Sequence, residues 1–372
     1  MKIAYRTGAL AVAAVLSLSL AACTAENEAP TSQAPGTGSA TEPATALSGT
    51  LNGAGSSAQQ SAMDAWRADF QNANSGLTIN YDPVGSGGGI TAFLDGSVSW
   101  AGSDSALKDP DEYTAAVARC GVDGAINLPV YISPIAVVFN IEGVTSLNLD
   151  AATVAKIFEG TIKNWNDPAI AAFNDGVTLP DLAITTVHRS DESGTTKNFT
   201  EYLEKASGGA WTHESSKAWP IKSGETGEGT TGLMDVINST PGTIGYADAS
   251  KSGTAGVVSI KVGDAFNAPS AEGAATALAS STLASVNGEN DLAYNVDRTT
   301  TAAGAYPLML VSYAIVCQAY EDDAEKANVT GFLSYVASAE GQASAAAAAG
   351  SAPLPADLST KIESILAEIA SA

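Results

Sequence analysis

The sequence predicts an α/β protein with enough chain for two domains. Short stretches with a strand pattern, at residues 49–52 and 77–84, precede stretches in which apolar residues recur at helical spacing. The same alternation continues to the end of the chain, where residues 308–316 have a strand pattern and residues 362–369 a helical one. Such alternation is typical of α/β folds, and the 372 residues exceed what one hydrophobic core usually holds.

The N-terminal segment predicts secretion and a lipid anchor. Lys2 and Arg6 precede an apolar run at residues 9–22, which is too short to span a bilayer, so residues 1–22 are expected to be a signal peptide. The run ends in Leu-Ala-Ala-Cys, which resembles a bacterial lipobox, and we expect Cys23 to receive the lipid. An ordinary cleavage site beside an incidental cysteine is the alternative. Residues 23–46 are rich in Ala, Thr, Pro, Ser and Glu and are expected to form a disordered tether.

The charge of the chain excludes some partners. Forty acidic residues against seventeen Lys and Arg give a formal net charge of −23, which argues against nucleic acid and anionic membrane surfaces as ligands. Such a chain cannot attract an anion through its overall field. An anion would have to be held by short-range hydrogen bonds instead.

The segment 189–196, Arg-Ser-Asp-Glu-Ser-Gly-Thr-Thr, has the composition of an anion site. Apolar residues at helical spacing follow it, so Ser193, Gly194 and Thr195 are expected at a helix N-terminus, where backbone N–H groups lack partners within the helix. Arg189 adds a permanent charge whose fork of donors suits a phosphate or a carboxylate.

Two further segments, 53–57 and 85–89, are read as small-residue turns between a strand and a helix. A fourth Gly/Thr-rich segment at 224–232 also leads into a helical pattern, and it is expected either to line the cleft or to be a plain surface loop. Helix capping is the ordinary role of Ser and Thr at such places. The repetition of the pattern favours binding.

Two cysteines remain after Cys23 is set aside. An even pair outside the cytoplasm predicts a disulfide between Cys120 and Cys317, and two buried free thiols are the alternative.

These segments, in this order, resemble the periplasmic-type phosphate-binding proteins that serve ATP-driven phosphate importers, here in lipoprotein form. The resemblance covers roughly residues 48–369 and implies a two-lobed periplasmic-binding-protein-like α/β fold of type II. It implies two crossing hinge strands, near residues 128–133 and 305–310. Lobe one would comprise residues 47–130 and 305–372, and lobe two residues 131–304. The segments that carry the resemblance are 51–57, 84–89, 101–104, 128–130, 162–168, 189–195 and 241–246.

The resemblance also implies the ligand contacts. Asp191 would pair with Arg189 and fix its guanidinium. Asp104 is unusual in an anion site, and it would select a ligand that still carries a proton, as phosphate does and sulfate does not. A turn cap is the alternative role for Asp104. The implied phosphate-binding residues are Ser57, Ser86, Asp104, Arg189, Ser193, Gly194 and Thr195.

The expected function is capture of inorganic phosphate by a lipid-anchored monomer outside the cytoplasm, with delivery to the membrane permease subunits of the importer. No catalytic residue, cofactor or metal is expected. A serine hydrolase or phosphatase is disfavoured because His188 and His213 stand in no recognisable catalytic context. A binder of the same fold for another oxyanion, such as arsenate or sulfate, is the alternative.

Overall fold

The computed structural model of the protein describes residues 47–372 except 109, 285 and 286. The predicted signal peptide, the tether and the lipidation site at Cys23 lie outside the described residues. The described residues form one compact unit of mixed α/β structure, as the sequence predicts. No described helix is long and apolar enough to cross a membrane.

An eleven-stranded sheet runs through this unit, with the main strand order β2-β1-β3-β13-β4-β8-β6-β7. Strands β2, β1 and β3 are parallel to one another, as are β7, β6 and β8, whereas β13 and β4 run antiparallel to their neighbours. The bounds of these strands are β1 Gly49–Gly55, β2 Leu77–Asp82, β3 Trp100–Ser103, β4 Ala125–Phe139, β6 Thr185–Arg189, β7 Glu225–Gly227, β8 Thr243–Asp248 and β13 Met309–Cys317.

Four of the parallel strands lead directly into helices through short segments. Within each parallel set the carboxyl ends of neighbouring strands lie at one edge, so the N-termini of the helices that follow them gather at that edge. Each helix buries an apolar stripe, as α1 does with Met63, Trp66 and Phe70. These helices are α1 Gln60–Ala73, α2 Gly85–Leu94, α6 Gly194–Ala206 and α7 Gly229–Ser239.

The glycine-rich segment 85–89 is not a turn before a helix, as the sequence suggested, but the first part of helix α2 itself. Gly85 has a φ of +87° and turns the chain into the helix, whereas Gly87 and Gly89 serve close packing. A Cβ on Gly89 would lie 2.3 Å from the Cα of Gly55, and a Cβ on Gly87 would lie 2.5 Å from the side chain of Glu192. The absence of side chains therefore lets α2 approach both β1 and the segment before α6.

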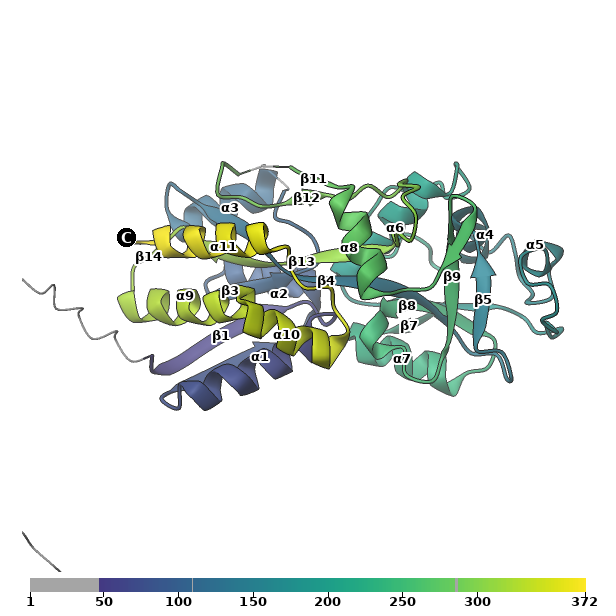
Figure 1. The fold of residues 1–372 in the computed structure, drawn as a ribbon, viewed down its shortest axis with the longest axis horizontal. Coiled ribbons are helices and arrows are strands. Elements are labelled where there is room, and N and C mark those ends of the chain that lie inside the picture. The colour runs from purple at the N-terminus through teal and green to yellow at the C-terminus, as the bar shows by residue number, and fades with distance from the viewer. Residues whose placement is uncertain (1–46, 109, 285–286) are drawn as a thin grey trace, which may run out of the picture. The chain divides into compact units, whose positions relative to one another are not determined.

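Strands β4 and β13 connect the two halves of the molecule (Figure 1). They pair antiparallel from Met309 opposite Pro134 to Cys317 opposite Ala125, and β4 then continues to pair with β8. Every residue of both strands is buried. The observed β4 extends beyond the hinge strand that was expected near residues 128–133, because one continuous strand takes part in both halves of the sheet.

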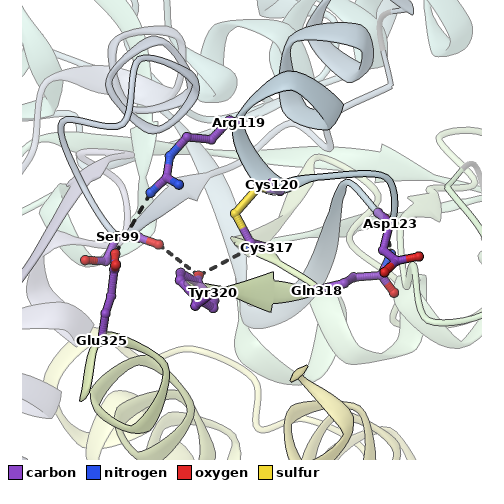
Figure 2. The surroundings of a disulfide bond; sticks show 8 residues. All are labelled: Ser99, Arg119, Cys120, Asp123, Cys317, Gln318, Tyr320 and Glu325. Atoms are coloured by element: carbon purple, nitrogen blue, oxygen red, sulfur yellow. Dashed lines mark hydrogen bonds and ion pairs between the residues drawn. A yellow bond between two sulfur atoms is a disulfide. The ribbon is translucent and has the colours of Figure 1, made fainter. Parts of the chain in front are cut away.

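The predicted disulfide is formed (Figure 2). Cys120 is the last residue of helix α3, Cys317 is the last residue of β13, and their Cα atoms are 5.2 Å apart across a sequence separation of 197 residues. Nearby, the hydroxyl of Tyr320 donates a hydrogen bond to the carbonyl of Ser99 over 2.9 Å. A cross-link that closes so long a loop restricts the unfolded chain, which stabilises the folded one.

The C-terminal helices return to the half that contains β1, β2 and β3 (Figure 1), and α10 packs against α1 while α11 packs against α9. The helical pattern predicted at residues 362–369 coincides with the end of α11. The remaining elements are α3 Pro110–Cys120, β5 Ser146–Leu149, α4 Ala151–Phe158, α5 Pro168–Ala171, a short 3₁₀ helix Ala249–Lys251, β9 Gly256–Val262, β10 Ala265–Asn267, α8 Ala271–Ala279, β11 Thr282–Leu283, β12 Tyr294–Asn295, β14 Ala319–Tyr320, α9 Asp323–Ala337, α10 Ala339–Ala349, α11 Ala356–Glu368 and β15 Ala370–Ser371.

Candidate ligand-binding site

The segments that join β1 to α1, β2 to α2, β6 to α6 and β7 to α7 meet at one place. The backbone N–H of Gly87 in α2 donates to the carbonyl of Glu192, just before α6, over 3.0 Å. The N–H of Thr230 in α7 donates to the hydroxyl of Ser57, just before α1, over 3.1 Å. Helix N-termini favour negative charge, so this meeting point is suited to an anion.

Arg189 stands at the end of β6 and is held by Asp191. The guanidinium donates two hydrogen bonds to the two carboxylate oxygens of Asp191, one of them from Nε over 2.7 Å. Asp191 also accepts the N–H of Gly229 at the start of α7, over 2.9 Å. Burial alone would raise the pKa of Asp191, but its bonds to Arg189 and Gly229 lower it below its ordinary value. The carboxylate is therefore ionised at neutral pH and orients a cation that is itself only 3% exposed.

Asp104 follows β3 and is 4% exposed. Its carboxylate accepts hydrogen bonds from the hydroxyls of Ser56 and Ser312, each over 2.6 Å, and from Thr195 over 3.0 Å. Burial raises the pKa of Asp104 above its ordinary value, and the three hydroxyls and the charge of Arg189 offset part of that rise. A carboxylate thus lies beside the N-terminus of α6, where an anion site would ordinarily exclude one.

Ser57 and Ser86 are both buried at this meeting point. The hydroxyl of Ser57 lies 2.9 Å from that of Thr230, and the hydroxyl of Ser86 accepts the backbone N–H of Asp104 over 3.1 Å. The contact with Thr230 places the start of α7 beside the site. Of the two interpretations of segment 224–232, this contact supports a role in lining the cleft.

Ser193 and Gly194 begin helix α6. The hydroxyl of Ser193 caps the helix by accepting the N–H of Thr196 over 3.2 Å. A Cβ on Gly194 would lie 2.5 Å from the hydroxyl oxygen of Ser86 and 2.8 Å from the Cβ of Asp104. The start of α6 therefore lies directly against the residues contributed by α2 and β3, and only glycine leaves room there.

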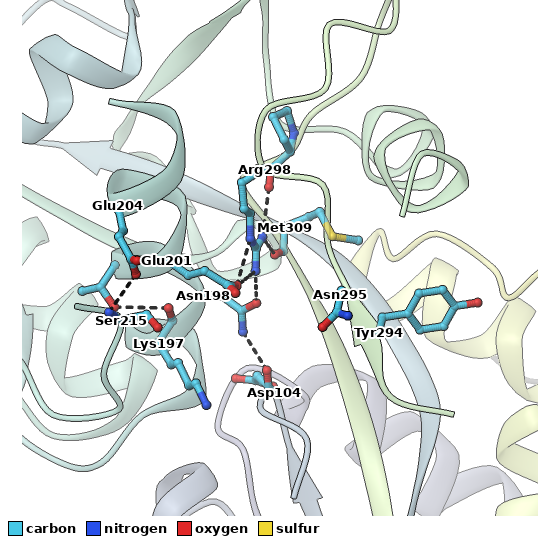
Figure 3. A network of polar contacts seen from close by, with 12 residues as sticks. Asp104, Lys197, Asn198, Glu201, Glu204, Ser215, Tyr294, Asn295, Arg298 and Met309 are labelled. Carbon is cyan, nitrogen blue, oxygen red and sulfur yellow. Dashed lines mark hydrogen bonds and ion pairs between the residues drawn. The ribbon is translucent and has the colours of Figure 1, made fainter. Parts of the chain in front are cut away.

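A second set of residues, which the sequence did not single out, supports the site from behind (Figure 3). The side-chain amide of Asn198 donates to the carbonyls of Asp104 and Gly194, over 2.7 and 2.9 Å. Its oxygen accepts a hydrogen bond from Arg298. Arg298 also donates to the carbonyl of Met309 over 2.6 Å, so this network connects helix α6 to the start of β13. Ser56, Ser312 and Thr230 were likewise not predicted.

A polar cavity of about 260 Å³ opens beside Asp104. Three cationic side chains and two carboxylates, Asp104 and Glu201, contribute to its lining, which leaves a local excess of one positive charge in a strongly acidic protein. Its charged lining residues besides Asp104 are Lys108, Lys197, Arg298 and Glu201.

The two histidines lie in other surroundings. His188 stacks on Trp219 with ring centroids 5.2 Å apart, and His213 lies 3.5 Å from the carboxylate of Glu159. Among the described residues, no group of three or more His, Cys, Asp or Glu side chains could hold a metal ion.

A two-lobed α/β fold whose helix N-termini meet beside two crossing strands defines a solute-binding protein. A family model described as a PBP superfamily domain matches residues 40–340. Phosphate-binding protein PstS 3 of Mycobacterium tuberculosis is 41% identical over 291 residues, which cover 76% of this chain and 77% of that protein. Phosphate-binding protein PstS of Xylella fastidiosa is 31% identical over 294 residues, which cover 77% and 76% of the two chains.

Solved structures show the same fold. That of the high-affinity periplasmic phosphate-binding protein PfluDING, bound with phosphate at pH 8.5, matches with a TM-score of 0.69 at 22% identity, over 85% of this chain and 93% of that one.

The chain belongs to the PstS family of phosphate-binding proteins, within the PBP superfamily. It is accordingly a solute-binding protein of transport and not an enzyme.

Proposed function

We propose that this protein captures inorganic phosphate between its two lobes and delivers it to an ATP-driven importer. The observation that carries the proposal is the position of Asp104, a buried carboxylate that accepts a hydrogen bond from Thr195 in the first turn of α6. Arg189 and the N–H groups of that turn supply positive charge and donors for an oxyanion. Asp104 supplies an acceptor for a proton on that oxyanion.

This combination favours phosphate over sulfate. Near neutral pH phosphate keeps at least one proton, which can be donated to Asp104, whereas sulfate has none. Sulfate would place an unprotonated oxygen against a buried carboxylate, with two like charges and no hydrogen bond between them. Arsenate keeps its protons much as phosphate does, so it is expected to compete.

The ligand set that we propose is the one predicted from the sequence. Three of its members would come from lobe one, residues 47–130 and 305–372, and four from lobe two, residues 131–304. The structure supports this division through β4 and β13, which pass between the halves. The proposed phosphate-binding residues are Ser57, Ser86 and Asp104 from lobe one and Arg189, Ser193, Gly194 and Thr195 from lobe two, with Asp191 orienting Arg189.

We also propose that the protein acts as a monomer anchored to the outer face of the cell membrane through a lipid on Cys23. The tether 23–46 would let the binding domain reach the permease subunits. The Cys23→Ser variant tests the anchor. It should leave the membrane fraction and appear in soluble form, whereas unchanged membrane association would contradict the proposal.

The binding proposal is tested by titrating the Cys23→Ser protein with phosphate, sulfate and arsenate while tryptophan fluorescence is recorded. Trp219 is a suitable reporter because it stacks on His188, the neighbour of Arg189. Phosphate should change the emission and saturate, arsenate should compete with it, and sulfate should do neither at equal concentration. A saturating response to sulfate that matches the phosphate response would overturn the proposal.

A further inference from the structure

The hydrogen bonds around Asp104 have fixed directions, and these directions bear on ligand choice. Two of the three hydroxyls that donate to this carboxylate, those of Ser56 and Ser312, bond to the same oxygen, Oδ1. The third, from Thr195, bonds to Oδ2. A hydroxyl has one proton to donate, so its direction is settled if its oxygen already accepts a hydrogen bond from another group.

The direction of the Ser312 hydroxyl is set by Gln59. The amide nitrogen Nε2 of Gln59 lies 2.6 Å from the Ser312 oxygen and 3.3 Å from the carbonyl oxygen of Tyr313. A carbonyl oxygen can only accept, so the Gln59 atom that faces both partners is the nitrogen. Ser312 therefore accepts from Gln59, and its single proton is directed to Asp104. Ser312 and Gln59 are both fully buried, so water does not compete for these bonds.

The direction of the Ser56 hydroxyl is set by the backbone. The N–H of Ala58 donates to the Ser56 oxygen over 3.1 Å, so the proton of Ser56 is also directed to Asp104, over 2.6 Å. Ser56 is 1% exposed. Two obligatory donors thus converge on Oδ1, which leaves this oxygen no room for a proton of its own.

We propose that Ser56 and Ser312 are specificity-determining residues: they hold Asp104 as an acceptor and direct Oδ2, the oxygen beside the N-terminus of α6, towards the proton of the ligand. This inference rests on the proposed function. It deepens that function by assigning the choice of a protonated oxyanion to the two serines as well as to Asp104. Gln59 is a positioning residue that acts through Ser312.

The two serines oppose the effect of burial. Burial raises the pKa of Asp104, and the bonds from Ser312 and Ser56 lower it. Without these bonds Asp104 would more readily take up a proton. The protonated carboxyl could then donate a hydrogen bond to an oxygen of sulfate, and the selection against sulfate would be lost. Other ionisable groups also face Asp104. Arg189, from β6, favours its ionised form. The others are the buried phenols of Tyr81 and Tyr131 and the cavity residues Lys108, Lys197, Glu201 and Arg298.

The test compares Ser312→Ala, Ser56→Ala and the double variant with Ser312→Thr, which restores a hydroxyl, all in the Cys23→Ser protein. Calorimetry gives the dissociation constants for phosphate and sulfate at pH 5.5 and pH 8. The ratio of the sulfate constant to the phosphate constant should fall about tenfold or more in each alanine variant, because each variant loses a buried hydrogen bond to the charged carboxylate of Asp104. The fall should be larger at pH 5.5 and largest in the double variant, and Ser312→Thr should keep the wild-type ratio.

An unchanged ratio in all the alanine variants that fold, at both pH values, would overturn the inference. Should Ser312→Ala not fold, Ser56→Ala tests a bond to the same carboxylate oxygen from the segment that follows β1. The parent protein, in which both serines are intact, separates a failure of this inference from a failure of the proposed function. If the parent protein fails to bind phosphate, the proposed function fails; if it binds phosphate selectively and the variants do too, only the role of the serines fails.

Discussion

The side-chain amide of Asn198 donates a hydrogen bond to the backbone carbonyl of Asp104 over 2.7 Å, which joins helix α6 directly to the segment after β3. The same nitrogen donates to the carbonyl of Gly194, and the amide oxygen accepts from Arg298. All three partners agree on the orientation of the amide, since carbonyls only accept and guanidinium only donates. Asn198 therefore connects the two lobes beside the ligand residues without itself being placed in the ligand set (Figure 3).

Asn198→Asp should weaken ligand binding without changing ligand choice. The substitution keeps an oxygen for Arg298 but places a carboxylate oxygen against two carbonyls. Loss of such a buried hydrogen bond costs about 1–3 kcal/mol, so phosphate affinity should fall roughly five- to 150-fold, and the phosphate-to-sulfate ratio should stay as it is.

Asn328→Asp is the matched control for Asn198→Asp. Asn328 is also buried, and its amide donates to the backbone carbonyl of Ser48 over 2.9 Å, away from the candidate site. It should lose stability but little phosphate affinity. Equal losses of affinity in the two variants, measured by calorimetry, would show that Asn198 has no special part in closing the cleft.

Gly194→Ala should impair binding through space alone. The added methyl group would lie 2.5 Å from the hydroxyl oxygen of Ser86, so the start of α6 could not approach α2 as it does. Gly232, in helix α7, is the control, because a Cβ there meets its nearest atoms at ordinary contact distance. We expect fluorescence titration to show at least about a tenfold loss of phosphate affinity for Gly194→Ala and little change for Gly232→Ala. Wild-type affinity in Gly194→Ala would refute this close approach.

Arg189→Lys should weaken phosphate binding although it keeps the charge. A lysine cannot form the paired hydrogen bonds with Asp191 that fix the guanidinium, and it presents a single point of charge to the ligand. Hydrogen bonds to charged groups contribute about 1.5–3 kcal/mol, so affinity should fall roughly ten- to 150-fold. Arg67→Lys, on helix α1, should leave affinity unchanged. Equal affinities for Arg189→Lys and its parent would place Arg189 outside the site.

Asp248 gives the protein a pH-dependent stability. It is the fully buried last residue of β8, beside β4, and its carboxylate accepts hydrogen bonds from the hydroxyl of Tyr131 and the N–H of Ser250. Burial raises its pKa to about 6. Between its unfolded value near 3.8 and about 6, the folded state therefore binds more protons than the unfolded state. The contribution of this group to stability is complete below pH 4 and is lost as the pH rises through 6.

Asp248→Asn should remove this dependence. The variant's unfolding free energy is compared with that of its parent at pH 4 and at pH 7. Its advantage over the parent should be larger at pH 7 by about 3 kcal/mol, which is what two pKa units correspond to. Urea unfolding of both proteins at the two pH values measures the difference. A variant whose advantage over its parent is the same at pH 4 and pH 7 would contradict the assignment.

Local patterns were sufficient to predict the start of helix α6. The cap at Ser193 and the apolar spacing behind it depend on residues within a few positions of one another, and α6 begins where they indicate. The bond between Cys120 and Cys317 followed from their number and from the expected compartment. Segment 85–89 was misread because glycine, which disfavours helices, is tolerated where close packing requires it.

The residues that hold Asp104 could not be found in the same way. Ser312 lies in an otherwise mostly apolar strand, and only the register of β13 brings it to Asp104. Asn198 and Arg298 are 100 residues apart in sequence. One signal was available: a serine within a fully buried strand must find a hydrogen-bond partner, and that requirement marks Ser312 as a residue with a specific contact.

The most direct test of the account is calorimetric titration of Asp104→Asn and its parent, both with Cys23→Ser, with phosphate and with sulfate at pH 7. The asparagine side chain keeps nearly the same shape but offers an amide donor in place of a carboxylate acceptor. The parent should bind phosphate and not sulfate, and the folded variant should lose most of that preference, because its amide can donate to sulfate. A variant that retains the full preference for phosphate would contradict the claim that Asp104 selects the protonated ligand.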